Sequence, residues 1–277
     1  MKKVRKRYLP EGWYPLDEDE CKQEIENFIN RNKKIKSNMG NVGGVVPHAG
    51  WYFSGKIATL VYMNINLKPE LVVIFGGHLS SSDEPLIVEE DVWETPLGEI
   101  EIDRDVIDDI VKKIHFDKDE WGDNTIEVQL PFIKYFFSNS KILPIRLPAS
   151  KRAIEIAESL SVLLKERSIK FITIGSSDLT HYGPNYGFIS HGTGKKALEW
   201  VKNVNDKEII DFAINMNAEK VIEHATINDS ACSSGAIAGV VAIARKLGVN
   251  KGTLLEYKTS YDIMPNDSFV GYAGIVY

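Results

Sequence analysis

Three apolar runs in this chain each end in glycine or proline and are followed by a histidine. The histidines are His48, His78 and His181. Short runs rich in valine and isoleucine are typical of buried strands, and strands buried on both faces belong to sheets covered by helices. In such open α/β sheets, ligands bind in the crevice beyond the carboxyl ends of the strands. The pattern therefore predicts that the three imidazoles share one crevice.

Apolar runs alternate with helical patterns along the whole chain of 277 residues. This alternation predicts an α/β fold, a single layered domain over residues 1–277 with a central, largely parallel or mixed sheet flanked by helices. The main strands are expected at residues 42–46, 71–75, 142–147, 171–174, 254–260 and 269–277. The helices are expected at residues 17–32, 54–63, 103–114, 124–137, 150–165, 195–224 and 231–247, with Pro131 at a helix start and breaks near Asn205 and Asn217.

Charge and cysteine content exclude several classes of function. The net charge of −6 argues against nucleic acid as a partner, because neutralising phosphates needs a basic face. No apolar run is long enough to span a bilayer, and no signal peptide is recognisable. Two cysteines form no disulfide framework, which fits a reducing, cytoplasmic location. The basic first residues, within an arm at 1–10, are expected to be solvated.

Two of the histidines suggest an incomplete metal site. If the first two strands are parallel neighbours, His48 and His78 lie close together, and a third ligand is then needed. The best candidate is Cys232, which we place in the first turn of a helix, where free N–H groups and the helix dipole lower a thiol pKa. A thiolate there binds metal or acts as a nucleophile. The structural alternatives are histidines bonded to loop carbonyls and a small residue that allows close packing.

Residues 175–183 place a carboxylate and an imidazole three positions apart beyond a strand. His181 could serve as a general acid or base, with Asp178 fixing its tautomer. An Asp/Ser-rich turn that caps its own backbone would explain Asp178 but not His181. A serine hydrolase using Ser176 or Ser177 with His181 is a weaker alternative, because no Gly-x-Ser-x-Gly elbow is present.

Two further segments adjoin these motifs. Residues 51–53 are aromatic and either wall a pocket or pack in the core. Residues 127–129 contain Glu127 and Gln129, which we expect to add polar groups to the crevice.

Several of these segments resemble the Memo family of cytosolic proteins. The matching segments are residues 12–15, 46–55, 76–78, 126–132, 176–182 and 268–272, together with Cys232, and the run from His48 to Gly55 is the most specific. The family's fold is similar to that of the class III extradiol ring-cleavage dioxygenases, which depend on iron. By this resemblance, His48, His78 and Cys232 match metal ligands, and Asp178 and His181 match the pair beside the metal.

The resemblance implies a metal-binding protein, and a redox enzyme of dioxygenase-like, oxidoreductase type is one expectation. A cysteine stands where the dioxygenases have a carboxylate, so the metal would be iron(II) or copper, with zinc possible. The ligand would be a small molecule or a peptide. The alternative is a non-catalytic adaptor that binds a peptide or protein partner in the same crevice, and a link to a radical SAM modification pathway is part of this expectation. The chain departs from the family pattern at Ser233, where glycine is usual, and near Asn124, where histidine is common.

Overall fold

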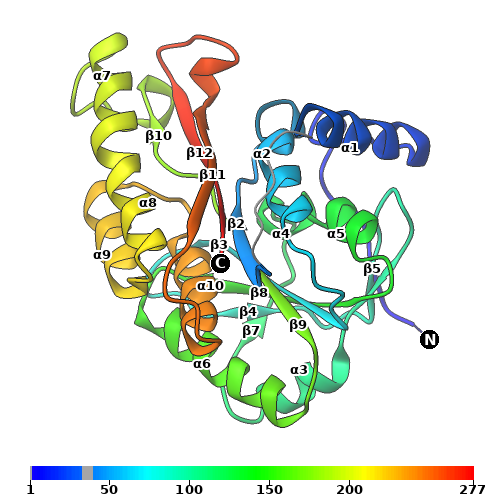
Figure 1. The fold of residues 1–277 in the computed structure, drawn as a ribbon. Helices are drawn as coiled ribbons and strands as arrows, with labels where there is room; N and C mark the ends of the chain where they lie inside the picture. The colour runs from blue at the N-terminus through cyan, green and yellow to red at the C-terminus, as the bar shows by residue number, and fades with distance from the viewer. Residues whose placement is uncertain (1, 33–39) are drawn as a thin grey trace.

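The computed structural model describes residues 2–32 and 40–277, and a mixed β-sheet lies at its centre (Figure 1). The strand order is β10-β12-β2-β9-β3-β8-β4-β7, and β11 pairs with β12. Its four parallel core strands are β2 (Gly43–Val46), β9 (Phe171–Ser176), β3 (Leu71–Leu79) and β8 (Lys141–Pro148). The antiparallel side is formed by β12 (Phe269–Val276), β11 (Thr253–Thr259) and β10 (His181–Tyr182). The predicted α/β class with a mixed central sheet is confirmed.

The strand neighbours differ from the expected ones. β2 and β3 do not pair, because β9 lies between them and is hydrogen-bonded in parallel to both. The crossover through α2 (Trp51–Met63) therefore skips one strand position. The local sequence pattern cannot reveal that β9 lies between these two strands, since β9 comes from a segment about 100 residues further along the sequence. Because β2, β9 and β3 are parallel, their carboxyl ends nevertheless lie at the same edge of the sheet.

Helices cover both faces of the sheet, as Figure 1 shows. On one side α10 (Ser234–Lys246) packs on β3, β8 and β9, with α6 (Lys151–Glu166) against it. Ala and Gly occur often in α10 and allow this close approach to the sheet, and every residue from Ser234 to Ala244 is buried. On the other side α2 packs on β2 and β12, with α1 (Glu18–Asn32) and α5 (Leu130–Phe136) outside it.

The remaining elements refine the predicted boundaries. The helical region expected at 195–224 is α7 (Lys195–Trp200), the π-helical turn η2 (Val201–Asn205), α8 (Asp206–Ile214) and α9 (Ala218–Asn228). Asn217 caps α9, as the predicted break suggested. The helix expected at 124–137 is split into α4 (Asn124–Glu127) and α5, with Pro131 in the first turn of α5. Short elements complete the chain: α3 (Arg104–Ile110), β4 (Leu86–Ile87), β6 (Ile100–Glu101), β7 (Asp117–Lys118), η1 (Pro184–Tyr186) and η3 (Ser260–Asp262).

The basic amino-terminal segment is only partly a solvated arm, because Lys2, Lys3 and Lys6 are exposed whereas the Arg5 side chain is largely buried in a strand pair. Residues Val4–Arg5 form β1, which pairs in parallel with β5 (Val92–Trp93). The side chain of Arg5 is only 10% exposed, and its guanidinium lies 4.5 Å from the ring centroid of Trp93. The aromatic face and buried partners of Arg5 explain why this cation leaves water. Met1 lies outside the described residues.

Among the residues that the structure describes, no helix is long and apolar enough to cross a membrane.

Candidate metal centre

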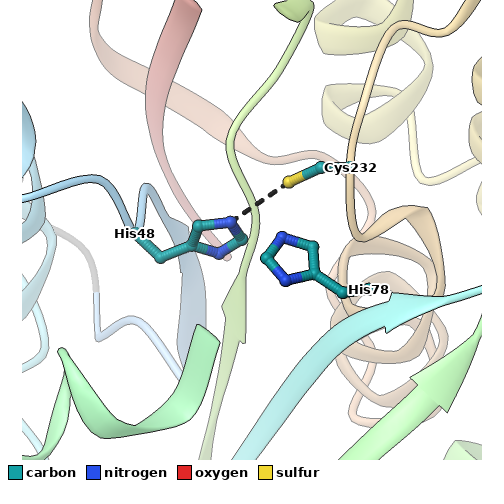
Figure 2. Close-up of side chains that lie close together, drawn as sticks. All are labelled: His48, His78 and Cys232. Atoms are coloured by element: carbon teal, nitrogen blue, oxygen red, sulfur yellow. Dashed lines mark hydrogen bonds between the residues drawn. The ribbon is translucent and has the colours of Figure 1, made fainter. Parts of the chain in front are cut away.

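His48, His78 and Cys232 meet at the carboxyl edge of the sheet (Figure 2). His48 follows the end of β2, His78 lies in the last residues of β3, and Cys232 lies just before α10. The two imidazole centroids are 5.0 Å apart with their planes nearly perpendicular. The Cys232 sulfur lies 3.1 Å from Nε2 of His48. One donor atom from each of the three residues lies within 4.8 Å of the other two.

These three residues fit a metal ion. Nitrogen and sulfur ligands lie about 2.0 to 2.3 Å from a bound zinc, so ligands at tetrahedral angles are about 3.5 Å apart. The donor spacing in this cluster brackets that value. Two imidazoles and one thiolate suit iron, copper or zinc rather than magnesium or calcium, which prefer oxygen ligands.

A polar neighbour holds the other nitrogen of each imidazole. Nδ1 of His78 lies 3.0 Å from a carboxylate oxygen of Asp123, and Nδ1 of His48 lies 3.4 Å from the hydroxyl of Ser176. Both contacts leave Nε2 to face the shared centre. Such outer contacts fix the tautomer and orientation of metal-binding histidines. Asp123 was not among the predicted site residues; in its local sequence it is the N-cap of α4 and accepts a hydrogen bond from the backbone N–H of Thr125.

The electrostatics of the cluster couple the thiol to the imidazoles. Burial alone would raise the pKa of Cys232, but the charge and hydrogen bond of His48 outweigh burial and hold that pKa well below its usual value. Burial lowers the pKa of His48, while Cys232 and Asp178 raise it, to about 9. For His78, burial is likewise outweighed by the hydrogen bonds to Asp123 and Cys232, which raise its pKa to about 10. Without metal, these shifts favour a thiolate at Cys232 and protonated imidazoles beside it.

Cys232 is not in the first turn of a helix, as we had expected. α10 begins at Ser234 with Ser233 as its N-cap, so the cysteine precedes the helix. Its backbone N–H is bonded to the carbonyl of Asp178. The low pKa of the thiol therefore comes from the histidines, and the helix dipole is not needed to explain it.

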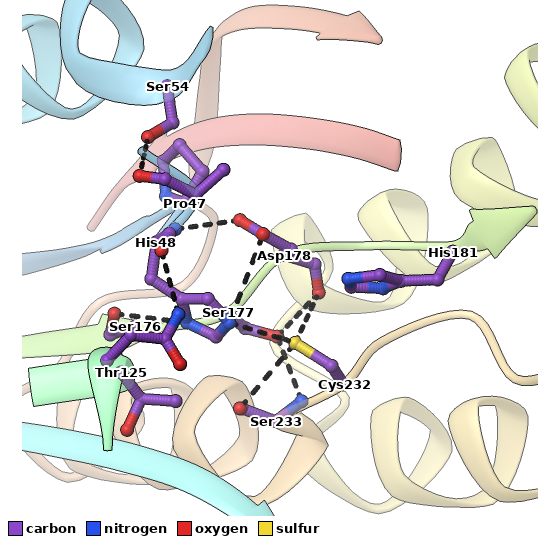
Figure 3. A network of polar contacts seen from close by, with 12 residues as sticks. Pro47, His48, Ser54, Thr125, Ser176, Ser177, Asp178, His181, Cys232 and Ser233 are labelled. Atoms are coloured by element: carbon purple, nitrogen blue, oxygen red, sulfur yellow. Dashed lines mark hydrogen bonds and ion pairs between the residues drawn. The ribbon is translucent and has the colours of Figure 1, made fainter. Parts of the chain in front are cut away.

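Asp178 contacts His48 instead of orienting His181. One oxygen of the buried Asp178 carboxylate accepts a hydrogen bond from the backbone N–H of His48 at 2.7 Å, and the other lies 4.0 Å from Nε2 of the same residue (Figure 3). Burial raises the pKa of Asp178. Nδ1 of His181 lies 3.1 Å from the carbonyl oxygen of Leu179, which fixes that ring without a carboxylate. His181 is nonetheless beside the cluster, with its ring directed toward Asp178 in Figure 3.

The serine-hydrolase alternative lacks the required geometry. Ser176 faces His48 and Gln129, and Ser177 donates to the carbonyl of Asp178. Both serines are completely buried, and in the described part of the chain neither is hydrogen-bonded to His181. A serine nucleophile needs its base within hydrogen-bond distance and access to substrate; the proposed base His181 does not bond to either serine, and burial denies both serines access to substrate.

The other expected crevice residues divide into two groups. The side-chain amide of Gln129 donates to the carbonyl of Pro47 and to Ser176, so this residue does support the site. Glu127 instead contacts the amino-terminal segment, where it accepts hydrogen bonds from Tyr8, Leu9 and Tyr14. The aromatic residues 51–53 serve both expected roles: Trp51 stacks in the core on Phe132, and Trp51 and Tyr52 also line a pocket beside residues 11–17.

Known proteins that resemble this chain establish its family. The family model described as "Memo-like protein" matches residues 6–276. The chain belongs to the Memo family. It is 33% identical over 276 residues to a MEMO1 family protein of Methanosarcina mazei, covering 95% of each chain. Comparable relatives occur in Nitrosopumilus maritimus, at 32% identity and 98% of each chain, and in Pyrobaculum arsenaticum, at 28% and 99%.

A solved structure resembles this Memo-family chain more distantly. It is that of an uncharacterized protein from Escherichia coli K12, with a TM-score of 0.48 and 11% identity, over 83% of this chain and 98% of the other.

Ser233 and Asn124, the two positions at which we expected a departure from the family pattern, lie beside the cluster of His48, His78 and Cys232. The side chain of Ser233 packs against Gly77, where an added Cβ would lie only 2.4 Å from the Cβ of Ser233. The amide of Asn124 donates a hydrogen bond to the carbonyl of His48 at 3.0 Å. Each residue therefore holds the backbone beside a ligand.

Proposed function

We propose that this protein binds a redox-active metal, iron(II) or copper, through His48, His78 and Cys232, and that it is a dioxygenase-like oxidoreductase. Zinc is the third candidate ion. The observation that carries the proposal is the convergence of three donor atoms within 4.8 Å, with Nδ1 of both histidines engaged by other groups. Three protein ligands leave coordination positions open, which is typical of catalytic rather than structural sites.

The ligand set favours a softer metal than the family's dioxygenase relatives use. Thiolate and imidazole together suit copper and zinc, and a thiolate also changes the potential of iron. The bound ion would supply the electron transfer. The residues of the chain would bind and orient the substrate and move protons.

His181 is the residue that we assign to proton transfer. Because its Nδ1 faces the carbonyl of Leu179, Nε2 is the nitrogen available to a substrate. His181 is partly exposed, and its ring lies 5.0 Å from that of Tyr186, which is 47% exposed. Asp178 holds the backbone of His48 and places negative charge beside the cluster. We propose that the ligand of this crevice is a small molecule or a peptide side chain.

Metal analysis of protein purified without oxygen tests the proposal. Wild-type protein should retain iron or copper in about one equivalent per chain, the amount that a single three-ligand site holds. The double variant H48A/C232A should lose it. The matched control is H115A/C21A, which also removes one histidine and one cysteine, neither of them in the cluster. Unaltered metal content in H48A/C232A would refute the assignment of these ligands.

A further inference from the structure

The backbone at His78 adopts a conformation that only its surroundings can maintain. His78 has φ +60°, in the left-handed region that side-chain-bearing residues rarely adopt. Such strain persists where neighbouring groups fix the backbone, and it is frequent at functional sites. The carbonyl of Gly77, the preceding residue, accepts a hydrogen bond of 2.9 Å from Nε of Arg146. Arg146 therefore binds the backbone carbonyl immediately before His78, a proposed metal ligand.

The same guanidinium also reaches the carboxylate that orients the His78 ring. Nη2 of Arg146 lies 3.4 Å from Oδ2 of Asp123, the oxygen that lies 3.0 Å from Nδ1 of His78. Nη1 of Arg146 lies 3.4 Å from Oδ1 of Asp119. The side chain of Arg146 is only 9% exposed and extends from β8, where it pairs in register with Gly76. One buried cation thus contacts both the backbone beside His78 and the carboxylate on its ring.

Arg5, on the amino-terminal strand β1, contacts the same carboxylate of Asp119 that Arg146 contacts. Its guanidinium donates to the carbonyls of Asp119 and Trp121, the latter at 3.0 Å, and lies 3.4 Å from Oδ1 of Asp119. These contacts fix the chain two residues before Asp123. The ion pairs form a continuous path from Arg5 through Asp119, Arg146 and Asp123 to His78.

We propose that Arg146 is the positioning residue for His78, and that Arg5 completes the same support, which makes the amino-terminal strand a part of the metal centre. This inference rests on the proposed metal-binding function. The guanidinium is suited to the task because its planar donors bind a carbonyl and two carboxylates at once. A lysine keeps the charge but offers a single point of attachment.

The conservative variant R146K tests this role, with zinc and cobalt ions as the probes. Competition with a chelator should show a loss of affinity of about 10- to 100-fold in R146K, the usual effect of removing an outer-shell partner. R5K should show a smaller loss. The matched control is R104K, because Arg104 also donates to a backbone carbonyl but lies on α3, away from the cluster. Its affinity should equal that of the wild type.

A measurement on the metal-free protein tests the positioning role of Arg146 separately from the proposed metal binding. Nitrogen NMR of the histidines reports the hydrogen bond from Nδ1 of His78 to Asp123, and R146K should weaken that bond while R104K should not. If the wild type binds neither ion, the proposed function fails, and the NMR result alone decides the role of Arg146. Unchanged affinity together with an unchanged His78 signal in R146K would overturn the inference. If R146K does not fold, the same two readouts on R5K decide.

Discussion

The sulfur of Cys232 lies 3.1 Å from Nε2 of His48, across a sequence separation of 184 residues. Each group stabilises the charged form of the other: His48 holds the pKa of the thiol low, and Cys232 helps to raise the pKa of His48 to about 9. These shifts favour a thiolate and an imidazolium in the pair when no metal is bound. Proton and metal compete for the same nitrogen atoms, since a ligating imidazole must be neutral.

The two cysteines should differ sharply in reactivity toward iodoacetamide. Cys232 is partly accessible and ionised at pH 7, whereas Cys21 is fully buried on α1, where burial raises its pKa to about 12. Because the thiolate is the nucleophile, alkylation of native protein at pH 7 should modify Cys232 and spare Cys21. Peptide mass spectrometry measures the modified fraction of each residue.

Two controls accompany the alkylation experiment. H48A removes the main partner of the thiolate, so labelling of Cys232 at pH 6 should slow markedly. Addition of zinc should protect Cys232 in the wild type. Equal labelling of both cysteines in folded protein would contradict the thiolate assignment.

The sequence predicted most of the fold because its core strands are short Val/Ile-rich runs bounded by Gly or Pro. The runs at 71–75 and 142–147 correspond to β3 and β8, and the buried face of α6 follows its helical spacing. The pairing order could not be read in this way. Placing β9 between β2 and β3 depends on packing between distant segments, which leaves no local pattern.

The proposed ligands could be predicted, whereas the groups that hold them could not. His48 and His78 stand out because they follow strands. Cys232 was predicted from an expected place in the first turn of a helix, and the family resemblance pointed to the same residue, although the structure places it before α10. Asp123, Arg146 and Arg5 are ordinary charged residues in their local sequence, and only tertiary structure brings them together. Asp178 was correctly placed near the site, but its hydrogen bond goes to the backbone of His48, a contact that spacing from His181 does not predict.

Substitution of Gly77 by alanine should weaken metal binding without removing any ligand. The new Cβ would lie 2.4 Å from the Cβ and Oγ of Ser233 and 2.9 Å from its Cα, so residues 232–233 must move away from β3. Overpacking of this kind costs about 1–3 kcal/mol of the free energy of unfolding. Zinc affinity and urea unfolding should both decline in G77A.

The double variant G77A/S233G checks the cause of that loss. Removing the Ser233 side chain eliminates two of the three close contacts, so zinc affinity should recover in part. The single variant S233G is the reference for the pair. If the double variant binds zinc no better than G77A, contact with the serine side chain is not the reason for the loss.

Glu127 anchors the amino-terminal segment, and its conversion to glutamine should loosen that segment. Its buried carboxylate accepts hydrogen bonds from the backbone N–H groups of Tyr8 and Leu9 and from the hydroxyl of Tyr14. In E127Q an NH₂ group replaces one carboxylate oxygen, so that two hydrogen-bond donors face each other. We expect this to lower the free energy of unfolding by about 1–3 kcal/mol. Urea unfolding should show this loss, with faster amide exchange at Tyr8 and Leu9. E155Q, on the exposed face of α6, should change neither; the same result for E127Q would contradict the anchoring role.

Asp206 is a buried carboxyl group next to the loop that carries His181. Its oxygens accept hydrogen bonds from the backbone and hydroxyl of Thr180 and from the hydroxyl of Tyr257. Burial raises the pKa of Asp206 to about 7, and the hydrogen bonds from Thr180 and Tyr257 offset only part of this effect. At pH 5 the folded protein therefore holds a proton on this carboxyl group, while the unfolded chain, with an ordinary pKa of 3.8, has mostly lost it.

Asp206 should consequently make the protein less stable as the pH rises. A folded-state pKa above the unfolded value contributes stability that is complete below about pH 4 and is lost as the pH passes 7; a difference of about three units corresponds to about 4 kcal/mol at most. D206N keeps the acceptor for Thr180 and replaces the proton with an amide N–H, so it should remove this dependence.

Urea unfolding from pH 5 to pH 8 should therefore show the wild type losing stability relative to D206N. D211N, on the exposed face of α8, should follow the wild type. Parallel profiles for wild type and D206N would show that Asp206 ionises normally in the folded protein.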